Sequence, residues 1–447
     1  MDARLLAYAD RTAPRYTSYP TAPHFSAAVN GVVYAAWLGA LAPEARLSLY
    51  LHIPFCREIC RYCGCHTFAT RKDEPIAAYA DALEVEIARV AATTPARRIA
   101  SIAWGGGTPN ILEPALFERI VRVLHDRFDL TTVTEHAIEI DPRLLTDAHA
   151  AAFARAGVTR ASLGVQDLNA HVQDAIGRVQ PAAQVSGAIG MLRGAGIGAI
   201  NVDLMYGLPL QSVADARRSA VLAAEMGPER LAVFGYAHVP WFKSRQRLIE
   251  EELLPDTATR FAQAEAIQET LMACGYHAIG FDHYARPDDP LARAAQTGAL
   301  TRSFQGYSLD DGDALIGIGA SAISTLPQGY AQNAAEPGAW ARALEGGGFA
   351  TARGVALSDE DRVRRTIINR LLCDFAVDLA PFGSFGAFPA ARAALAPLIQ
   401  DGLVSIAGER LTIPPDARPF ARLVAEAFDA YRAVHGAQGA ARHSRAV

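Results

Sequence analysis

At residues 50–65 the chain reads YLHIPFCREICRYCGC, a stretch that holds four of its six cysteines. These four, Cys56, Cys60, Cys63 and Cys65, follow an apolar run at residues 47–53 that is typical of a buried strand. A structural zinc site commonly uses two separated CxxC pairs, and a disulfide is rare in a reducing compartment. Thiolates that hold an iron–sulfur cluster therefore fit this spacing best.

The spacing CxxxCxxC assigns three of the thiolates to such a cluster. Cys56, Cys60 and Cys63 would bind three irons of a cubane and leave its fourth iron open, as catalytic metal sites keep one position for a substrate. Cys65 is left over by this spacing, and it either supports the loop or acts in catalysis by tuning the reacting centre. His52, on the preceding strand, either hydrogen-bonds near the cluster and tunes it or is an ordinary core histidine.

The composition narrows the class of protein. In 447 residues, 51% are hydrophobic and the formal net charge is −5, which argues against a polybasic nucleic-acid binder. Six cysteines in so long a chain exclude a disulfide scaffold. The N-terminus lacks an apolar targeting segment, and the longest uncharged stretches are too short to span a bilayer. We therefore expect a cytoplasmic protein with no membrane span and no nucleic-acid partner.

Strand-like and helix-like segments alternate from residue 47 onward. The apolar runs lie at residues 47–53, 99–104, 136–140, 160–165, 199–204 and 231–236, and the segments with helical period lie at residues 74–92, 113–127, 146–156, 182–194 and 213–226. This alternation predicts βα units and a parallel sheet, hence an α/β protein. Six units favour a partial (β/α)6-type barrel, although periodicity alone does not separate it from an open doubly wound sheet.

The flanking regions differ from this pattern. Residues 1–45 are rich in proline and predict an extended N-terminal arm with one short helix near residues 34–41. The barrel domain is expected at residues 46–330. Residues 331–447 form a mainly helical C-terminal domain, which we expect to be winged-helix-like because helices at 359–373, 388–400 and 419–434 surround a small hairpin.

Polar or glycine-rich residues follow every predicted strand, where a barrel carries its chemistry. They are Gly105–Gly107, Glu139 and Asp141, Gln166 and Asp167, Asp203, and Tyr236-Ala237-His238. For any one of them, ordinary turn and cap chemistry is an alternative explanation. The glycines would let a ligand approach the backbone closely, and the absence of a following Lys-Ser/Thr argues against a phosphate-binding loop.

The cysteine spacing after a first barrel strand, with Tyr62 before the third cysteine, resembles the radical S-adenosylmethionine (SAM) superfamily. A closer resemblance, to the oxygen-independent coproporphyrinogen III oxidases, covers nearly the whole chain. The motifs that carry it are RYTSYPTA at 15–22, HIPFCxxxCxxCGC at 52–65, WGGGTP at 104–109, ExDP at 139–142, SLGVQD at 162–167, DLMYGLP at 203–209, DHYARPD at 282–288 and FQGY at 304–307.

This resemblance implies decarboxylation of two propionates of coproporphyrinogen III to vinyl groups, giving protoporphyrinogen IX in anaerobic haem synthesis. It implies one [4Fe–4S] cluster held by Cys56, Cys60 and Cys63, and two SAM molecules, with a 5′-deoxyadenosyl radical formed by cleavage of SAM. The first SAM would contact Tyr50, Tyr62, Gly106, Glu139 and Ile323. The second would contact Gly107, Thr108, Gln166, Arg178, Asp203 and Ala237.

The substrate carries four propionates, so its pocket needs local cations that the total charge does not reveal. We expect Arg15 in the arm to bind one propionate, with His283 and Arg286 as further candidates. An electron donor such as flavodoxin is expected, and the loosely matching C-terminal region would cover the barrel mouth or dock that donor. We also expect a monomer. Two other functions compete: a haem-binding chaperone related to these enzymes, which typically lacks Cys65 and the arm motif, and a plain iron–sulfur electron carrier.

Overall fold

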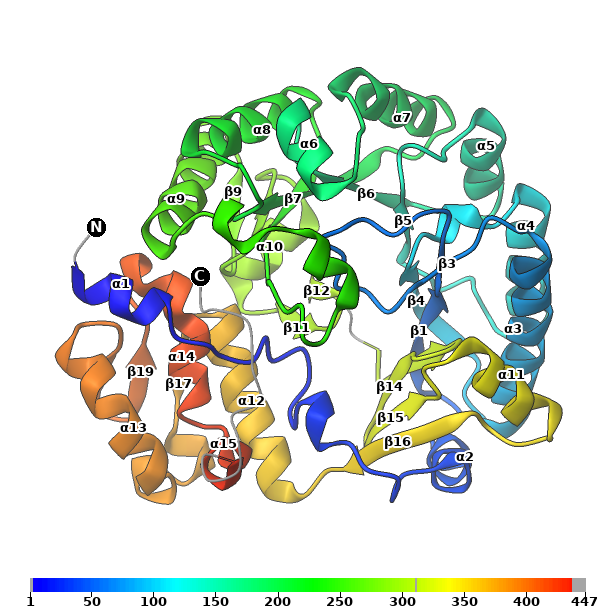
Figure 1. The fold of residues 1–447 in the computed structure, drawn as a ribbon. Coiled ribbons are helices and arrows are strands. Elements are labelled where there is room, and N and C mark those ends of the chain that lie inside the picture. The colour runs from blue at the N-terminus through cyan, green and yellow to red at the C-terminus, as the bar shows by residue number, and fades with distance from the viewer. Residues whose placement is uncertain (1–2, 310–311, 436–447) are drawn as a thin grey trace.

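The structure is a computed structural model that describes residues 3–309 and 312–435. Its central element is a twelve-stranded sheet in the order β16-β15-β14-β13-β1-β4-β5-β6-β7-β8-β10-β9. The sheet curves into a barrel that stays open, because within the described residues β16 (Thr351–Ala356) and β9 (His277–Ile279) are edge strands (Figure 1). The partial α/β barrel expected from the sequence is thus confirmed.

Six neighbouring strands run parallel and correspond to the six apolar runs. They are β1 (Arg46–Ile53), β4 (Arg98–Gly106), β5 (Glu135–Ile140), β6 (Arg160–Gln166), β7 (Ala199–Tyr206) and β8 (Arg230–Gly235). The sheet extends on both sides of this set. β13 (Ala314–Ile318) pairs parallel with β1, and β14 (Ile323–Leu326), β15 (Gly329–Asn333) and β16 add antiparallel strands. On the far side β10 (His283–Ala285) pairs antiparallel with β8.

Helices cover the outer face of the sheet, as βα connections require. In chain order the main ones are α3 (Glu74–Thr93), α4 (Pro114–Arg127), α5 (Asp147–Arg155), α7 (Ala182–Gly194), α8 (Val213–Glu225) and α9 (Thr257–Ala273). Capping residues fix where helices begin. At α8, the Ser212 hydroxyl accepts from the Asp215 backbone N–H while the Asp215 carboxylate accepts from the Ser212 N–H. Their inner faces pack on the sheet, with Trp104 and Phe117 fully buried between β4 and α4.

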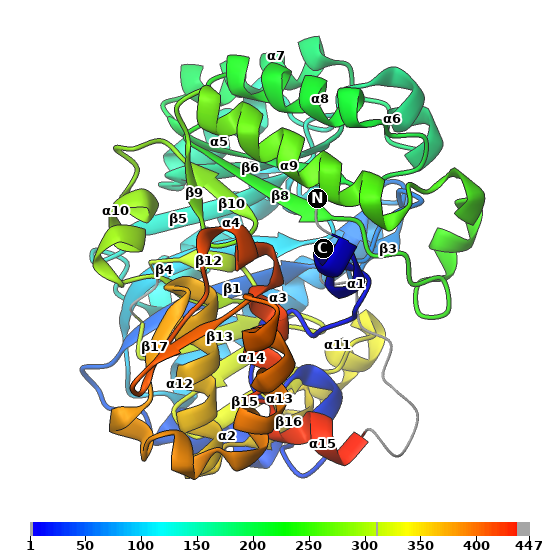
Figure 2. The same ribbon diagram turned by 90° about the vertical axis from the view of Figure 1, so that its left-hand side faces the viewer.

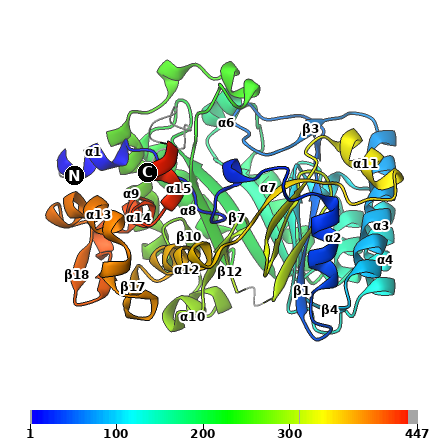
Figure 3. The same cartoon turned by 90° about the horizontal axis from the view of Figure 1, so that it is seen from below.

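The N-terminal arm runs from the C-terminal region to the first strand of the barrel. It begins with α1 (Ala3–Ala9), which the sequence did not predict, and contains α2 (Gly31–Gly39) near the expected short helix. α2 starts earlier than expected because the Asn30 side chain accepts from the N–H groups of Val32 and Val33. Figure 3 shows α1 beside the C-terminal helices, and α2 packs against α3 and β16. The expected boundary at residue 330 stays a prediction, and the sheet itself continues to Ala356.

The C-terminal region is mainly helical. α12 (Asp359–Cys373) and α13 (Pro389–Gln400) pack around a three-stranded sheet in the order β17-β19-β18, formed by Ala376–Asp378, Arg410–Thr412 and Ser405–Ala407. The helix expected at residues 419–434 is wrong as one element. A 3-10 turn at Pro415–Phe420 leads into α14 (Ala421–Glu426), and α15 (Ala430–His435) begins as a separate helix. The break between them ends at Asp429, whose carboxylate accepts from the Tyr431 N–H and so caps α15. None of the described helices has the length and apolarity needed to cross a membrane.

Candidate active site

The cysteine loop begins where β1 ends. Its first residues form β2 (Phe55–Cys56), which pairs with β3 (Phe68–Ala69) and so closes the loop into one compact unit. Cys60 is buried, Cys56 and Cys63 are half-buried, and Cys65 is exposed; all four thiols are free. The loop therefore presents several thiols at the carboxyl end of the first barrel strand.

The thiols differ in acidity. A hydrogen bond with Cys65 is the main cause that lowers the pKa of Cys63 to about 7, and the same bond raises the pKa of Cys65 well above its ordinary value. Burial raises the pKa of Cys56 to about 12, against a hydrogen bond donated by Thr67 over 3.3 Å. The Cys63–Cys65 pair thus places the more stable thiolate on Cys63.

Two guanidinium groups point toward Cys60. The Sγ atom lies 3.5 Å from Nη1 of Arg178 and 4.0 Å from Nη2 of Arg143. Asp141 holds both arginines, at 3.3 Å from Arg178 and 2.7 Å from Arg143. Burial would lower the pKa of Arg178, but Tyr62, Asp141 and Cys60 outweigh it and raise that pKa. Positive charge is therefore stabilised directly beside this thiol.

These side chains fit an iron–sulfur cluster. Within the described part of the chain, no three His, Cys, Asp or Glu side chains converge as ligands of a single metal ion. A cubane differs from such a site, because each thiolate binds a different iron and the sulfurs need not meet at one point. Thiols on one loop, with the two guanidinium groups beside Cys60, provide suitable donors and offset the negative charge of thiolate ligands.

His52 is buried and both of its ring nitrogens are occupied. Nε2 lies 3.0 Å from the backbone oxygen of His66, which can only accept, so Nε2 carries the proton. Nδ1 then accepts from the Tyr50 hydroxyl over 3.1 Å. Burial lowers the pKa of His52 to about 4. The ring is thus neutral at physiological pH and connects the first strand to the cysteine loop.

The glycine motif packs directly onto this strand and loop. Gly106 has φ +116°, and a Cβ there would lie 2.7 Å from Cε1 of His52. The N–H groups of Gly107 and Thr108 donate to the backbone oxygens of Ile53 and Phe55 over 2.8 and 2.9 Å. The missing side chains at these glycines therefore allow the strand and loop that carry the cysteines to pack closely against this motif.

Glu139 and Asp203 face the interior from neighbouring parts of the sheet. Glu139 accepts from the Gly106 N–H over 3.2 Å, and Asn201 donates to Asp203 over 2.8 Å. Enclosure by the barrel raises the pKa of both carboxyls, to about 7 for Glu139, where Asp203 adds repulsion, and to about 6 for Asp203. Gln166 follows at a bulge in β6 with φ +70°, so its backbone leaves the regular strand.

A cavity of about 710 Å³ occupies the barrel interior. Of the predicted site residues, Arg15, Tyr50, Glu139 and Asp203 line it, and so does the further candidate His283. Arg286 does not: its guanidinium lies over the Tyr276 ring. A volume of this size lies within the range of about 300–1,000 Å³ that small-molecule and cofactor sites commonly span.

Arginines from three regions of the chain line this cavity. Arg15 comes from the arm, Arg260 from α9 and Arg422 from α14. Arg260 lies over the Tyr206 ring at 5.7 Å, and Arg422 donates to the backbone oxygen of Ala13 over 3.0 Å. Burial, with the nearby charges of Arg15 and Arg302, lowers the pKa of Arg422 to about 10. The wall is thus crowded with positive charge, which favours a ligand with carboxylates.

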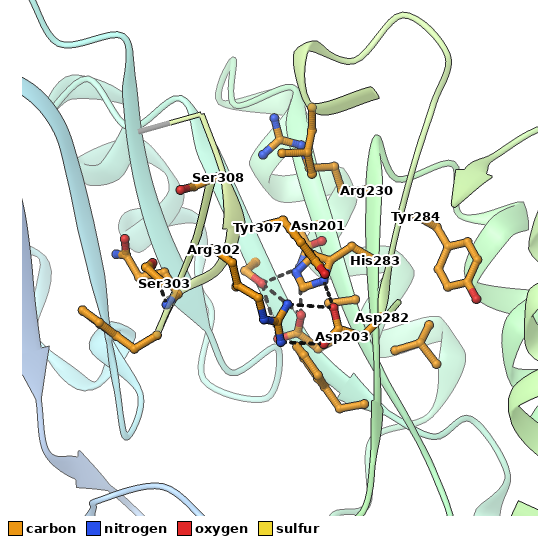
Figure 4. Close-up of a pocket in the computed structure, with 18 of the residues that line it drawn as sticks. Asn201, Asp203, Arg230, Asp282, His283, Tyr284, Arg302, Ser303, Tyr307 and Ser308 are labelled. Carbon is orange, nitrogen blue, oxygen red and sulfur yellow. Dashed lines mark hydrogen bonds and ion pairs between the residues drawn. The ribbon is translucent and has the colours of Figure 1, made fainter. Parts of the chain in front are cut away.

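Asp282, His283 and Arg302 form an ionic group at the same cavity (Figure 4). Asp282 accepts from Arg302 over 3.0 Å and lies 2.6 Å from Nδ1 of His283. Burial would raise the pKa of Asp282, but Arg302 and His283 outweigh it and hold that pKa well below its usual range. Figure 4 shows Asn201 and Asp203 beside this group.

The other predicted residues lie outside the cavity wall. Tyr62 packs on an apolar cluster with Tyr236 and Leu208, and its backbone oxygen accepts from Gln246 over 2.8 Å. Thr108 is buried and donates to Asn110 over 3.0 Å. Ala237 and Ile323 are half-buried, just after β8 and at the start of β14.

Sequence reasoning missed the arginines at 260, 302 and 422. Arg302 stands two residues before Phe304, the first residue of the FQGY motif, a signal that could have drawn attention to it. Arg260 and Arg422 lie in helices outside every motif that the sequence offered, and they carry no local signal.

Comparison with known proteins supports the same interpretation. Residues 50–223 match the family model of the radical SAM superfamily, and residues 357–420 match that of the HemN C-terminal domain. The oxygen-independent coproporphyrinogen III oxidase of Bradyrhizobium diazoefficiens is 48% identical over 99% of each chain. The protein of that name from Escherichia coli is 38% identical over 96% of this chain and 95% of its own.

A solved structure, that of the coproporphyrinogen III oxidase HemN from Escherichia coli, described as a radical SAM enzyme, superposes with a TM-score of 0.90. It is 36% identical and covers 96% of this chain and 99% of that one. From the strand order, the cysteine loop and these relatives together, the chain belongs to the oxygen-independent coproporphyrinogen III oxidase family of the radical SAM superfamily.

Proposed function

We propose that this protein catalyses the oxygen-independent oxidative decarboxylation of two propionates of coproporphyrinogen III, giving protoporphyrinogen IX. The observation that carries this proposal is the cavity of about 710 Å³, whose arginines from the arm, the barrel and the C-terminal region lie beside the strand ends of a radical SAM barrel. A tetrapyrrole with four carboxylates is the kind of ligand that such a wall favours. Relatives named for this activity support it.

Membership of the superfamily implies a [4Fe–4S] cluster and SAM. When bound, these groups supply a 5′-deoxyadenosyl radical that can remove a hydrogen atom from a propionate side chain. We assign Cys56, Cys60 and Cys63 as the cluster ligands, and Tyr50, Tyr62, Gly106, Glu139 and Ile323 to the first SAM. The acidic Cys63 and the guanidinium groups beside Cys60 support this ligand set.

We also propose a second SAM, beside Gly107, Thr108, Gln166, Arg178, Asp203 and Ala237. The position of Arg178 supports a link between the two sites, because this residue contacts Cys60 as well as the Gly164 backbone oxygen, at 2.6 Å. The carboxylate of Asp203 can accept from an ammonium or a ribose hydroxyl.

The arm contributes both charge and closure. Arg15 exposes its guanidinium to the cavity, where its hydrogen bond to the Gly235 oxygen is long, at 3.4 Å. We assign it to one propionate of the substrate. The Arg422 bond to Ala13 and the Tyr16 bond to Asp429, at 3.0 Å each, hold the arm across the open side of the barrel. Excluding water in this way protects a reactive intermediate from side reactions.

Two other residues act through their neighbours. The Cys65 hydrogen bond stabilises the Cys63 thiolate, so we assign Cys65 a tuning role in catalysis rather than a ligand role. The His52 ring holds its proton on Nε2 and packs against Gly106, so it positions the cysteine strand and the glycine motif.

We further propose that the protein acts as a monomer in the cytoplasm and receives electrons from a small redox protein such as flavodoxin. Free cysteines throughout the described residues agree with a reducing compartment. We propose that the chain consists of an arm at residues 1–45, a barrel domain at 46–330 and a helical C-terminal domain at 331–447.

One experiment tests the function directly. The cluster is reconstituted without oxygen, and SAM, a reductant and coproporphyrinogen III are added. Formation of protoporphyrinogen IX together with 5′-deoxyadenosine supports the proposal. Cleavage of SAM without decarboxylation, or tight haem binding without turnover, would contradict it and favour the haem-chaperone alternative.

A further inference from the structure

Exposed hydrophobic side chains gather beside the cysteine loop. Of the twelve large hydrophobic side chains that are exposed in the described residues, five lie here: Leu210, Trp241, Phe242, Leu248 and Leu253. Trp241 and Phe242 are the aromatic ones in that set of twelve, with exposed fractions of 51% and 75%. Contiguous exposed apolar surface of this kind marks interaction sites.

Most of this surface belongs to the connection between β8 and α9, here called the 239–253 segment. Figure 2 shows it projecting from the molecule beside β3, which closes the cysteine loop. None of its residues lines the barrel cavity, so it does not form part of the substrate wall. Its aromatic side chains are therefore exposed on the outside of the molecule.

The segment is anchored on the cysteine loop itself. The buried Gln246 donates to the Tyr62 backbone oxygen over 2.8 Å, and Nζ of Lys243 donates to the Cys65 backbone oxygen over 3.1 Å. Its apolar part continues into a groove of about 380 Å³, which Leu248, Leu253 and Arg61 of the cysteine loop share. The exposed surface thus lies directly over the residues that flank the predicted cluster ligands.

Positively charged residues lie next to the two aromatic residues of the 239–253 segment. Lys243, Arg245 and Arg247 fall within five residues, in a chain that carries a net charge of −5 and only one other lysine. Arg245 and Arg247 are both exposed, and Arg247 donates to the backbone oxygen of Pro240 over 3.3 Å. Three acidic residues, Glu250 to Glu252, follow at the far end of the segment.

We propose that the 239–253 segment is the docking surface for a small acidic electron-transfer protein that reduces the cluster. The carrier is oxidised by one electron and the cluster is reduced by one electron. The positive rim attracts an acidic partner, and the exposed aromatics supply a small apolar contact. Redox encounters typically use small interfaces, below about 1,200 Å², so a few exposed side chains are enough to form one. Attraction between opposite charges raises the association rate and makes it depend on salt.

The test uses the full-length protein with its cluster reconstituted, and reduced flavodoxin as the probe. Bleaching of the cluster absorbance in an anaerobic stopped-flow instrument reports its reduction. The double variant Arg245→Glu/Arg247→Glu should be reduced at least about tenfold more slowly at low ionic strength, and the difference should shrink as salt is added. Dithionite, which needs no protein docking, should reduce both proteins at the same rate.

A matched control carries the same change of charge elsewhere. Arg122 and Arg127 are exposed on α4, so Arg122→Glu/Arg127→Glu should leave the flavodoxin rate unchanged. Phe242→Ser tests the apolar contact and should weaken the affinity for flavodoxin measured by titration calorimetry on the cluster-free protein.

Three results would overturn the proposal. They are an unchanged flavodoxin rate in the Arg245/Arg247 variant, an equal slowing with dithionite, and a wild-type dimer that Phe242→Ser converts to a monomer. The last result would mean that a second copy of the chain covers this surface. Because cluster reduction is measured without any porphyrinogen, failure here is distinct from failure of the proposed substrate.

Discussion

Nη1 of Arg178 lies 3.5 Å from Sγ of Cys60 and 3.3 Å from the carboxylate of Asp141. This side chain joins a thiol of the cysteine loop to the loop that follows β5. A guanidinium held in this place stabilises negative charge on the sulfur, and hydrogen bonds to cluster sulfurs are a known means of setting reduction potential.

Replacing Arg178 should therefore make the cluster harder to reduce. Arg178→Gln removes a charged hydrogen-bond donor worth roughly 1.4 kcal/mol, which for one electron corresponds to a midpoint potential lower by about 60 mV. Redox titration followed by electron paramagnetic resonance measures the shift. Arg193→Gln, at the end of α7, is the control and should not move the potential. An unchanged potential in Arg178→Gln would mean that the contact to Cys60 has no electrostatic effect.

Removing the Cys65 thiol should raise the pKa of Cys63 without loss of iron. In Cys65→Ala the hydrogen bond that holds the Cys63 pKa at about 7 is gone, so the thiol should ionise at higher pH. The pH dependence of alkylation in the cluster-free protein measures this, and its midpoint should move upward by about one unit or more toward the ordinary value. Iron analysis after reconstitution should match the wild type. A drop in iron would show that Cys65 is a ligand.

Arg15 should affect substrate binding more than SAM chemistry. Arg15→Gln removes a cation from the cavity wall and should raise KM for coproporphyrinogen III at least about tenfold, since a hydrogen bond to a charged group is worth about 1.5–3 kcal/mol. Arg11→Gln is a control in the same arm, because Arg11 contacts the Tyr8 ring rather than the cavity. Equal KM values in the two variants would show that Arg15 does not bind the substrate.

Glu86 should make the stability of the protein depend on pH. It is buried in α3 and accepts from the Gly319 N–H, the Asn333 amide and the Trp340 indole, over 2.6, 2.7 and 3.0 Å. Burial raises its pKa to about 7, despite these bonds. The unfolded chain releases this proton near pH 4.3, so the folded state holds more protons between about pH 4.3 and 7. The free energy of unfolding should therefore fall as pH rises through this window.

Chemical unfolding at pH 5 and pH 8, followed by tryptophan fluorescence, measures this loss. Glu86→Gln cannot titrate and should lose less stability over the same range. If the two proteins show the same pH dependence, Glu86 is already ionised in the folded state at pH 5.

The glycine motif should tolerate no side chain at Gly106. Its φ of +116° and the approach of His52 predict that Gly106→Ala destabilises the protein by about 1–3 kcal/mol and reduces iron incorporation. Gly187→Ala is the control, because a Cβ there meets nothing within 4 Å in the middle of α7. Gly187→Ala should raise the free energy of unfolding by about 0.5–1 kcal/mol, because alanine favours the helical conformation more than glycine does. Melting temperatures and iron content distinguish the two, and a normal Gly106→Ala protein would contradict the packing seen at His52.

Much of the fold follows from local pattern. The six parallel strands lie within two residues of the apolar runs, because each run is a buried strand whose neighbours in the chain are also its neighbours in the sheet. The pattern was less informative where segments are short or interrupted. α1 and the antiparallel strands β14 to β16 lack a strong period, and the break between α14 and α15, at the capping residue Asp429, interrupts a segment that otherwise has helical spacing.

The sequence by itself determined the succession of βα units and the cysteine loop, because strand period and CxxxCxxC spacing are local properties of adjacent residues. Only the tertiary structure decided the cavity wall. Arg15, Arg260 and Arg422 are separated by more than 150 residues from one another along the chain, and the arm, α9 and α14 bring them to one surface. No local sequence pattern predicts that these three arginines lie close together, because their positions depend on how the arm and the C-terminal helices pack across the open side of the barrel.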